Sequence, residues 1–211
     1  MKNPNCIRTF TGKNFNIFVP KLRLIDIRDI AHAESLITRF TGHTKKLYSV
    51  AQHSLIMEEL AEPEYKLETL LHDGTEAFTN DVSTILKRKL PDYKAIENNL
   101  HHVIATKYSL FDPFPKEVKE LDNEVFDMEW KYLMLKKEKQ GKSRFPASKF
   151  KYMSPERAER FFLKRFEILY AERLLKIKND KKFSMRSQIT PLLKNTLPQS
   201  KTAQFIFENG C

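Results

Sequence analysis

The chain has 211 residues, 41% of them hydrophobic and 30% charged, which suffices for one sizeable core but not for two full-sized domains. Residues 1–135 carry 18 Lys and Arg against 20 Asp and Glu, a net charge of −2, whereas residues 136–211 carry 19 against 7, a net charge of +12. The positive formal charge of +10 therefore comes from the C-terminal third of the chain. No apolar run approaches the roughly 18 residues of a membrane-spanning helix, and the first residues lack the apolar core of a signal peptide, so we expect a cytoplasmic protein with no membrane partner.

The N-terminal part of the sequence predicts a small hairpin followed by helices. Aromatic and β-branched residues flank a turn-forming Thr-Gly-Lys-Asn within residues 7–20, a pattern typical of a short β-hairpin. Apolar residues then recur at helical spacing from Asp29 to Phe40. The next helix is expected to begin after Ser49, a good N-cap, and to end before the Glu62-Pro63 pair.

Later segments repeat the helical pattern. Further helices are expected over residues 64–78, 93–108, 116–137 and 154–176, with a polar turn between the first two of them. We therefore predict an all-α helical bundle with a small N-terminal β-hairpin, formed by a domain of residues 1–176. A basic C-terminal extension over 177–211 has little apolar periodicity and reads as a tail.

The pair His72-Asp73 stands out because it directly follows two leucines in an apolar segment. Burying such a pair without partners costs several kcal/mol, so it needs hydrogen bonds or a metal ion. His53 on the inward face of the preceding helix and Asp122, set between apolar residues of a later one, are the other candidate ligands. Two imidazoles and two carboxylates suit a divalent transition ion. The alternative is a set of hydrogen-bonded core residues without a metal.

Two more carboxylates lie close in sequence to this pair. Glu76 follows Asp73 by three residues and so lies on nearly the same helix face, and Asp81 stands in the turn beyond it. A carboxylate held next to a metal site can act as a general acid or base. Glu76 and Asp81 are therefore the candidate catalytic residues.

The chain contains three sequence segments in this order: RFTGHTKKLYSVAQHS, LLHDGTEAFTNDVSTILKRKLPDYKAIE and VKELDNEVFDMEW. Together they resemble the HD-domain metal-dependent phosphohydrolases, in the branch of the bacterial 5′-deoxynucleotidases and phage deoxynucleoside triphosphohydrolases. The resemblance covers roughly residues 7–137. It implies an HD-domain helical bundle whose metal ligands are His53, His72, Asp73 and Asp122.

The resemblance also implies roles for the surrounding residues. Glu76 matches the carboxylate that acts on the attacking water or the leaving oxygen, and Asp81 matches the one near the sugar and the nucleophile. Arg39 falls where the deoxynucleotidases keep a phosphate-contacting arginine, and a guanidinium can hold two phosphate oxygens at once. Lys87 is a second candidate phosphate ligand, with a solvated lysine as the alternative.

The expected activity is hydrolysis of a small nucleotide with a divalent metal ion, Co, Mn, Zn or Mg. Two reactions fit the resemblance: a 5′-monophosphate cut to nucleoside and phosphate, or a dNTP, with dATP preferred, cut to deoxynucleoside and triphosphate. The resemblance also implies a homo-oligomer. The alternative is a nucleotide sensor or a nucleic-acid-binding protein that uses its basic C-terminal region, since basic groups release counterions from phosphate backbones.

Overall fold

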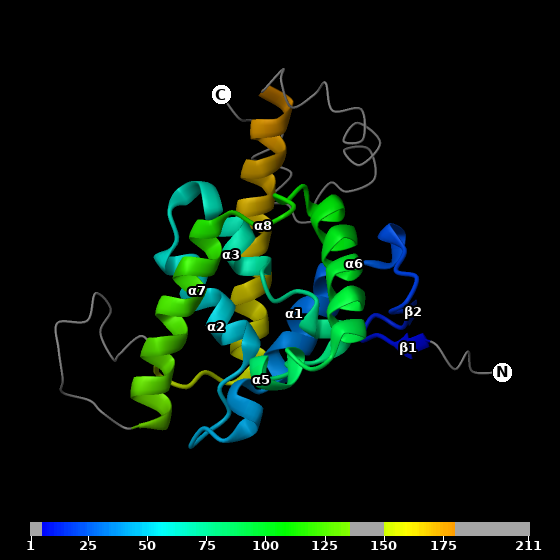
Figure 1. Cartoon of the computed structure of the whole chain (residues 1–211). Coiled ribbons are helices and arrows are strands. Elements are labelled where there is room, and N and C mark those ends of the chain that lie inside the picture. Colours follow the sequence, from blue (N-terminus) through cyan, green and yellow to red (C-terminus); the bar gives the residue numbers. More distant parts are fainter. Residues whose placement is uncertain (1–5, 136–149, 180–211) are drawn as a thin grey trace.

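A computed structural model describes residues 6–135 and 150–179 of the chain. It is mostly helical, with a small two-stranded sheet at the N-terminal end (Figure 1). The helices are α1 (Ile27–Leu36), α2 (Val50–Leu60), α3 (Lys66–Leu71), α4 (Glu76–Thr79), α5 (Thr84–Lys87), α6 (Pro91–Tyr108), α7 (Lys116–Glu129) and α8 (Pro155–Asn179). The predicted helical class is thus confirmed.

The predicted N-terminal hairpin is also present. Strand β1 (Cys6–Arg8) pairs antiparallel with β2 (Asn14–Asn16), and Gly12 in the turn adopts a φ of 81° that favours glycine. The turn is tied to α1, because the backbone N–H and the hydroxyl of Thr11 donate to the Asp29 carboxylate at 2.7 and 2.8 Å. The hairpin is therefore anchored to α1 by two hydrogen bonds.

Side-chain caps fix where α1 and α2 begin. The Asp26 carboxylate accepts from the backbone N–H of Arg28 at 3.0 Å, and the Ser49 hydroxyl accepts from that of Gln52 at 3.2 Å. Each cap satisfies an N–H group that the first turn of a helix leaves without a partner. The expected start of α2 after Ser49 is confirmed.

The connection between α1 and α2 contains an unusual turn. Phe40 and Thr41 have φ values of 55° and 52°, and Gly42 continues in the same region with 77°. Left-handed backbone costs of order 1–3 kcal/mol for a non-glycine residue, and it persists only where the surroundings enforce it. An antiparallel bridge between Thr38 and Ser49 closes the loop at its base. Helix α1 therefore ends one turn earlier than the apolar spacing predicts.

The core is organised around α8. This helix packs against α1, α2 and α3, while α2 also packs against α3 and α7. The main cluster of buried side chains joins the hairpin, α1, α3, α6 and α8, and includes Phe15, Ile30, Leu70, Leu100 and Phe162. A second cluster joins α2 to α7 and includes Tyr48, Met57 and Val125. Helix α2 thus contacts both α3 and α7.

One expected helix is broken where the His-Asp pair lies. The predicted helix over 64–78 consists of α3 and α4, separated by a turn at His72–Thr75. The backbone N–H of Gly74 donates to the Leu71 carbonyl at 3.0 Å, and a Cβ at Gly74 would lie 3.1 Å from that oxygen. Because glycine allows this close approach, the chain can turn directly after α3 and present both residues of the pair.

Other boundaries differ by smaller amounts. The expected polar turn before α6 contains the short helix α5, and α7 gives way after Glu129 to a wider helical turn over Trp130–Met134. Helix α8 continues three residues beyond the expected domain boundary at 176. The rest of the predicted extension, 180–211, lies outside the described residues. Among the helices of the described ranges, none combines the length and apolar character needed to cross a membrane.

Candidate metal centre

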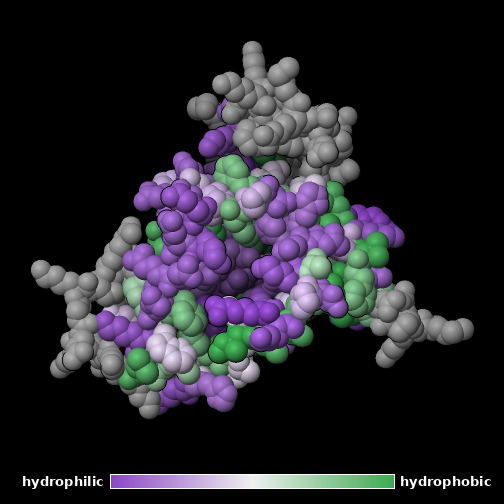
Figure 2. Space-filling model, in the orientation of Figure 1, coloured by the Kyte–Doolittle hydropathy of each residue, from purple (hydrophilic) through white to green (hydrophobic). Residues whose placement is uncertain are grey.

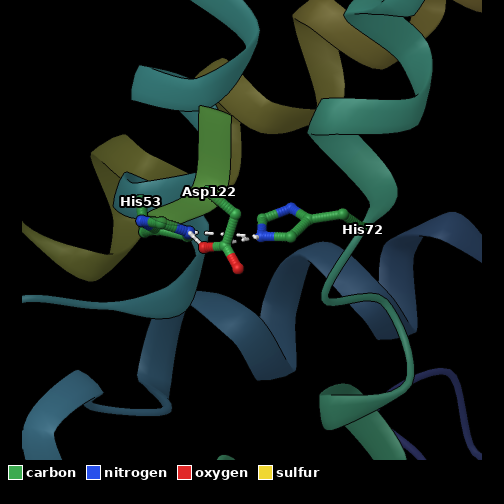
Figure 3. Close-up of side chains that lie close together, drawn as sticks. All are labelled: His53, His72 and Asp122. Carbon is green, nitrogen blue, oxygen red and sulfur yellow. Dashed lines mark hydrogen bonds and ion pairs between the residues drawn. The ribbon is translucent and has the colours of Figure 1, made fainter. Parts of the chain in front are cut away.

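Three helices bring the expected ligands together. His53 comes from the middle of α2, His72 from the end of α3, and Asp122 from α7 (Figure 3). The Nε2 atoms of the two imidazoles are 3.2 Å apart, and Oδ1 of Asp122 is 3.2 Å from Nε2 of His53 and 3.8 Å from that of His72. All three side chains offer a donor atom within 4.8 Å of the other two, so this group could hold a metal ion.

Asp73 reaches the same imidazoles from the turn after α3. Its Oδ2 atom lies 3.1 Å from Nε2 of His72 and 3.9 Å from Nε2 of His53. The four residues predicted as ligands thus meet around the Nε2 atoms. Their separation in the sequence is large, so this convergence depends on the packing of α2 against α3 and α7.

The remaining nitrogen of each imidazole faces an acceptor. Nδ1 of His53 lies 2.6 Å from Oε1 of Glu129, and Nδ1 of His72 lies 2.8 Å from the Thr69 carbonyl oxygen. Each acceptor requires a proton on Nδ1, so in the neutral imidazoles both Nε2 lone pairs point at one another. Two lone pairs at 3.2 Å repel unless a cation lies between them. This donor set fits a divalent transition ion.

The electrostatics of the group also favour a cation. Burial opposes a positive imidazole, but the Asp73 and Asp122 carboxylates outweigh it and raise the pKa of His72 to about 9. Burial likewise opposes charge on Asp73, yet the neighbouring His72, His53 and Arg39 hold the pKa of that carboxyl well below its usual range. The charges around the two imidazoles therefore favour a cation in the centre.

Glu129 is a site residue that the sequence reasoning missed. It is completely buried, and its Oε1 atom accepts from the Tyr48 hydroxyl at 2.7 Å as well as facing Nδ1 of His53. Its Oε2 atom accepts from Nε of Arg39 at 3.1 Å. A signal was available, because Glu129 follows Asp122 by seven residues and so lies two turns further along the same face of α7.

Arg39 lies beside the centre, as expected, but its guanidinium already has protein partners. Besides Glu129, it donates through Nη1 to Oδ2 of Asp73 at 3.4 Å, and its side chain is 11% exposed. Within the described ranges no hydrogen bond engages its Nη2 group. The arginine is thus fixed by two carboxylates and retains donor capacity for an anion.

The expected catalytic carboxylate Glu76 borders the same region. It is 5% exposed, and its Oε1 atom accepts from Nζ of Lys87 at 3.3 Å, whereas its Oε2 atom is buried without a hydrogen-bond partner among the described residues. Burial, with the nearby charges of Asp73 and Asp81, raises the pKa of Glu76 well above its usual range. Glu76 is thus suited to carry a proton.

Lys87 does not point freely into the site. Its Nζ atom is 2.7 Å from Oε1 of Glu97 on α6, closer than to Glu76, so it is shared between two carboxylates. Glu97 was not predicted as a partner of Lys87, because no periodicity in the sequence distinguishes it.

Asp81 lies just beyond α4, after Asn80 with a φ of 70°, and burial raises the pKa of Asp81. The site is thus rich in carboxylates with few cations.

One face of the molecule has a polar, recessed surface. Figure 2 shows a hollow near the centre of the face seen in Figure 1, with hydrophilic residues around it, between the parts of the molecule formed by α7 and α6. Charged groups in a recess are less solvated than on an open surface, which strengthens their interactions. The hollow therefore suits a small charged ligand.

Comparison with known proteins gives relatives but no activity. No family model matches the chain. The chain is 45% identical over 106 residues to the uncharacterized protein YfdR of Escherichia coli (strain K12), covering 49% of this chain and 58% of that protein. It is 31% identical over 122 residues to an uncharacterized protein of Rhodobacter capsulatus, covering 53% of this chain and 62% of that protein. The chain thus spans less than two thirds of the length of these relatives.

Proposed function

We propose that the protein is a metal-dependent phosphohydrolase of small nucleotides, built as an HD-domain helical bundle. The observation that carries the proposal is the convergence of the His53 and His72 Nε2 atoms, both with their Nδ1 atoms engaged, on the carboxylates of Asp73 and Asp122. Such a centre holds a divalent cation and leaves ligand positions for water and substrate. The three sequence segments that resemble HD-domain phosphohydrolases, and their order, support the same proposal.

The chemistry divides between the cation and the side chains around it. A divalent ion in this centre would polarise a phosphoryl oxygen and lower the pKa of a water molecule. In hydrolysis the water oxygen bonds to phosphorus, the bond from phosphorus to the 5′ oxygen breaks, and that oxygen leaves with a proton. The Oε2 atom of Glu76 is buried without a hydrogen-bond partner in the described part of the chain, and it can take the proton from water or supply it to the leaving oxygen. Asp81 lies beside it as the second acid or base.

Cationic side chains account for binding of the phosphate. Arg39 is held in place by Glu129 and Asp73, and its remaining N–H donors can receive a phosphoryl oxygen. Lys87 supplies a second positive charge at the edge of the site, where it also contacts Glu76. A homo-oligomer remains part of the proposal.

Product analysis tests the activity. The protein, loaded in turn with Co, Mn, Mg and Zn, would be incubated with each deoxynucleoside monophosphate and triphosphate, and the products separated by ion-pair chromatography. Triphosphate released from dATP would identify a triphosphohydrolase, and phosphate released from monophosphates a 5′-nucleotidase. Absence of metal-dependent turnover on every nucleotide would refute the proposal and favour a sensor.

Two variants separate binding of the metal from catalysis. His72→Ala should lose bound metal and hydrolysis together, because it removes an Nε2 donor. Glu76→Gln should lose hydrolysis and keep the metal, measured by plasma mass spectrometry after dialysis. Glu120→Gln, on the exposed surface of α7, is the control that should change neither. Near-normal turnover in Glu76→Gln would show that the acid–base assignment is wrong.

A further inference from the structure

An aromatic surface extends from the metal centre along α7. Phe126 and Trp130 follow Asp122 at successive intervals of four residues, so all three lie along one side of the helix. With a rise of 1.5 Å per residue, the first aromatic ring is attached about 6 Å along the axis from the metal ligand. Phe126 and Trp130 are 43% and 44% exposed, which is high for such large rings.

The two rings are arranged in parallel, as a stacking surface requires. Their centroids are 6.3 Å apart with an interplanar angle of 21°. Phe40 packs against both, with centroid distances of 5.6 Å to Phe126 and 6.0 Å to Trp130. The left-handed turn at Phe40 and Thr41 thus places Phe40 against both rings, and Phe126 and Trp130 remain partly exposed.

The position of this surface relates it to the phosphate-binding side of the site. Phe40 directly follows Arg39, whose guanidinium contacts Asp73 and lies 5.8 Å from the Phe40 ring centroid. Because Phe40 follows Arg39 and packs against both Phe126 and Trp130, a ligand whose phosphate reaches Arg39 has the aromatic pair close by. Nucleotides are small phosphate esters that carry such a flat ring, the base, in the same molecule.

We propose that Phe126 and Trp130 form a stacking platform for the base of the nucleotide substrate. The inference rests on the proposed function, because it assumes that the phosphate lies at the metal centre. Base stacking on aromatic side chains tolerates every base, since each has a π-face, and its loss weakens binding about 5- to 150-fold. The platform therefore selects base-bearing phosphates over base-free ones and discriminates weakly among bases.

Intrinsic fluorescence tests the platform directly, because Trp130 is the only tryptophan of the chain. Glu76→Gln protein loaded with Mg, which is expected to keep the metal without hydrolysing the ligand, would be titrated with dAMP and, separately, with deoxyribose 5-phosphate. A base stacked on the indole quenches its emission, so we expect saturable quenching by dAMP and none by the base-free ester. Phe126→Ala should weaken the quenching about 5- to 150-fold. Phe111→Ala, which removes a ring 41% exposed elsewhere on the surface, should leave it unchanged.

A second readout covers the reaction of the metal-loaded protein. Trp130→Ala should lower kcat/KM for the best nucleotide mainly by raising KM, while leaving kcat/KM for deoxyribose 5-phosphate unchanged; Trp130→Phe should restore the nucleotide value. If Trp130 had a purely structural role, its replacement would lower kcat/KM for both substrates alike. That result would overturn the inference.

The outcomes distinguish the two proposals. Quenching by dAMP without hydrolysis of any nucleotide supports the platform and removes the proposed function. Hydrolysis of nucleotides with no change in fluorescence, or equal quenching by both esters, overturns the platform alone. A concentration-dependent emission without ligand, together with loss of a dimer in Trp130→Ala, would instead assign this surface to contact between copies and would also overturn it.

Discussion

Replacing Glu129 tests whether the buried carboxylate organises the metal centre. Its two oxygens serve the Tyr48 hydroxyl, Nδ1 of His53 and Nε of Arg39 at 2.7, 2.6 and 3.1 Å. Glu129→Gln keeps the size of the side chain but removes its charge and one acceptor oxygen. The His53 imidazole then faces at best a neutral amide oxygen in place of the carboxylate that fixes its tautomer. Weakening such an outer partner typically lowers metal affinity about 10- to 100-fold.

The same change should destabilise the fold, because Arg39 would keep only Asp73 as a charged partner in a site where it is 11% exposed. Removing one member of a buried ion pair costs about 3–5 kcal/mol. For a domain of this size each kcal/mol lowers Tm by about 2–4 °C, so we expect a decrease of about 6–20 °C. Burial opposes charge on Glu129, but His53 and Arg39 lower the pKa of its carboxyl, so the wild-type group is ionised at neutral pH.

Calorimetric titration with Zn or Mn and differential scanning calorimetry of the apo-protein measure the two effects. Glu120→Gln is the matched control on the same helix, because its side chain is 68% exposed and its contact with Lys116 is 3.9 Å long. Exposed pairs of this kind contribute about 0–1 kcal/mol. Unchanged metal affinity and unchanged Tm in Glu129→Gln would refute the role assigned to this carboxylate.

Three further measurements address the caps and the metal centre. Ser49→Ala removes the α2 cap and should cost about 1 kcal/mol, seen as a Tm lower by about 2–4 °C; an unchanged Tm would contradict the cap. Burial opposes charge on Asp26, but Arg28 and Lys13 lower the pKa of its carboxyl below the unfolded value near 3.9. The charge of Asp26 therefore stabilises the fold above that pH, and this stabilisation is lost as the pH falls through the lower folded pKa. The Tm difference between wild type and Asp26→Asn should shrink below about pH 4. A constant Tm difference from about pH 7 to pH 2 would rule this out. Added Zn should raise the Tm of the apo-protein, by mass action, and not that of His72→Ala; equal rises would place the metal elsewhere.

Much of the fold follows from local patterns in the sequence. The start of α2 depends on Ser49, and the hairpin on a turn with Gly12, both of which act within a few residues. The break between α3 and α4 was not predicted, because apolar spacing continues across it. The turn at Gly74 depends instead on the close approach of its backbone to the Leu71 carbonyl.

Part of the candidate site was predicted from ionisable residues in apolar segments. His72 and Asp73 are conspicuous because they are charged within an apolar segment, and the structure brings them to His53 and Asp122. Glu129 was missed although it shares the helix face of Asp122, because a buried carboxylate is revealed only by partners distant in the sequence. Lys87 was expected to face phosphate, and its pairing with Glu97 on α6 depends on how α5 packs there.

The three helices that supply the imidazoles and Asp122 link the donor set to the packing of distant parts of the chain. His53 and His72 are 19 positions apart and can meet once α2 packs on α3, whereas Asp122 arrives from 50 positions further along the chain. Closing that longer loop requires α7 to dock, which carries a greater entropic cost. The full donor set therefore exists only while α7 is docked on α2, so the affinity for a cation reports on this contact between distant parts of the chain.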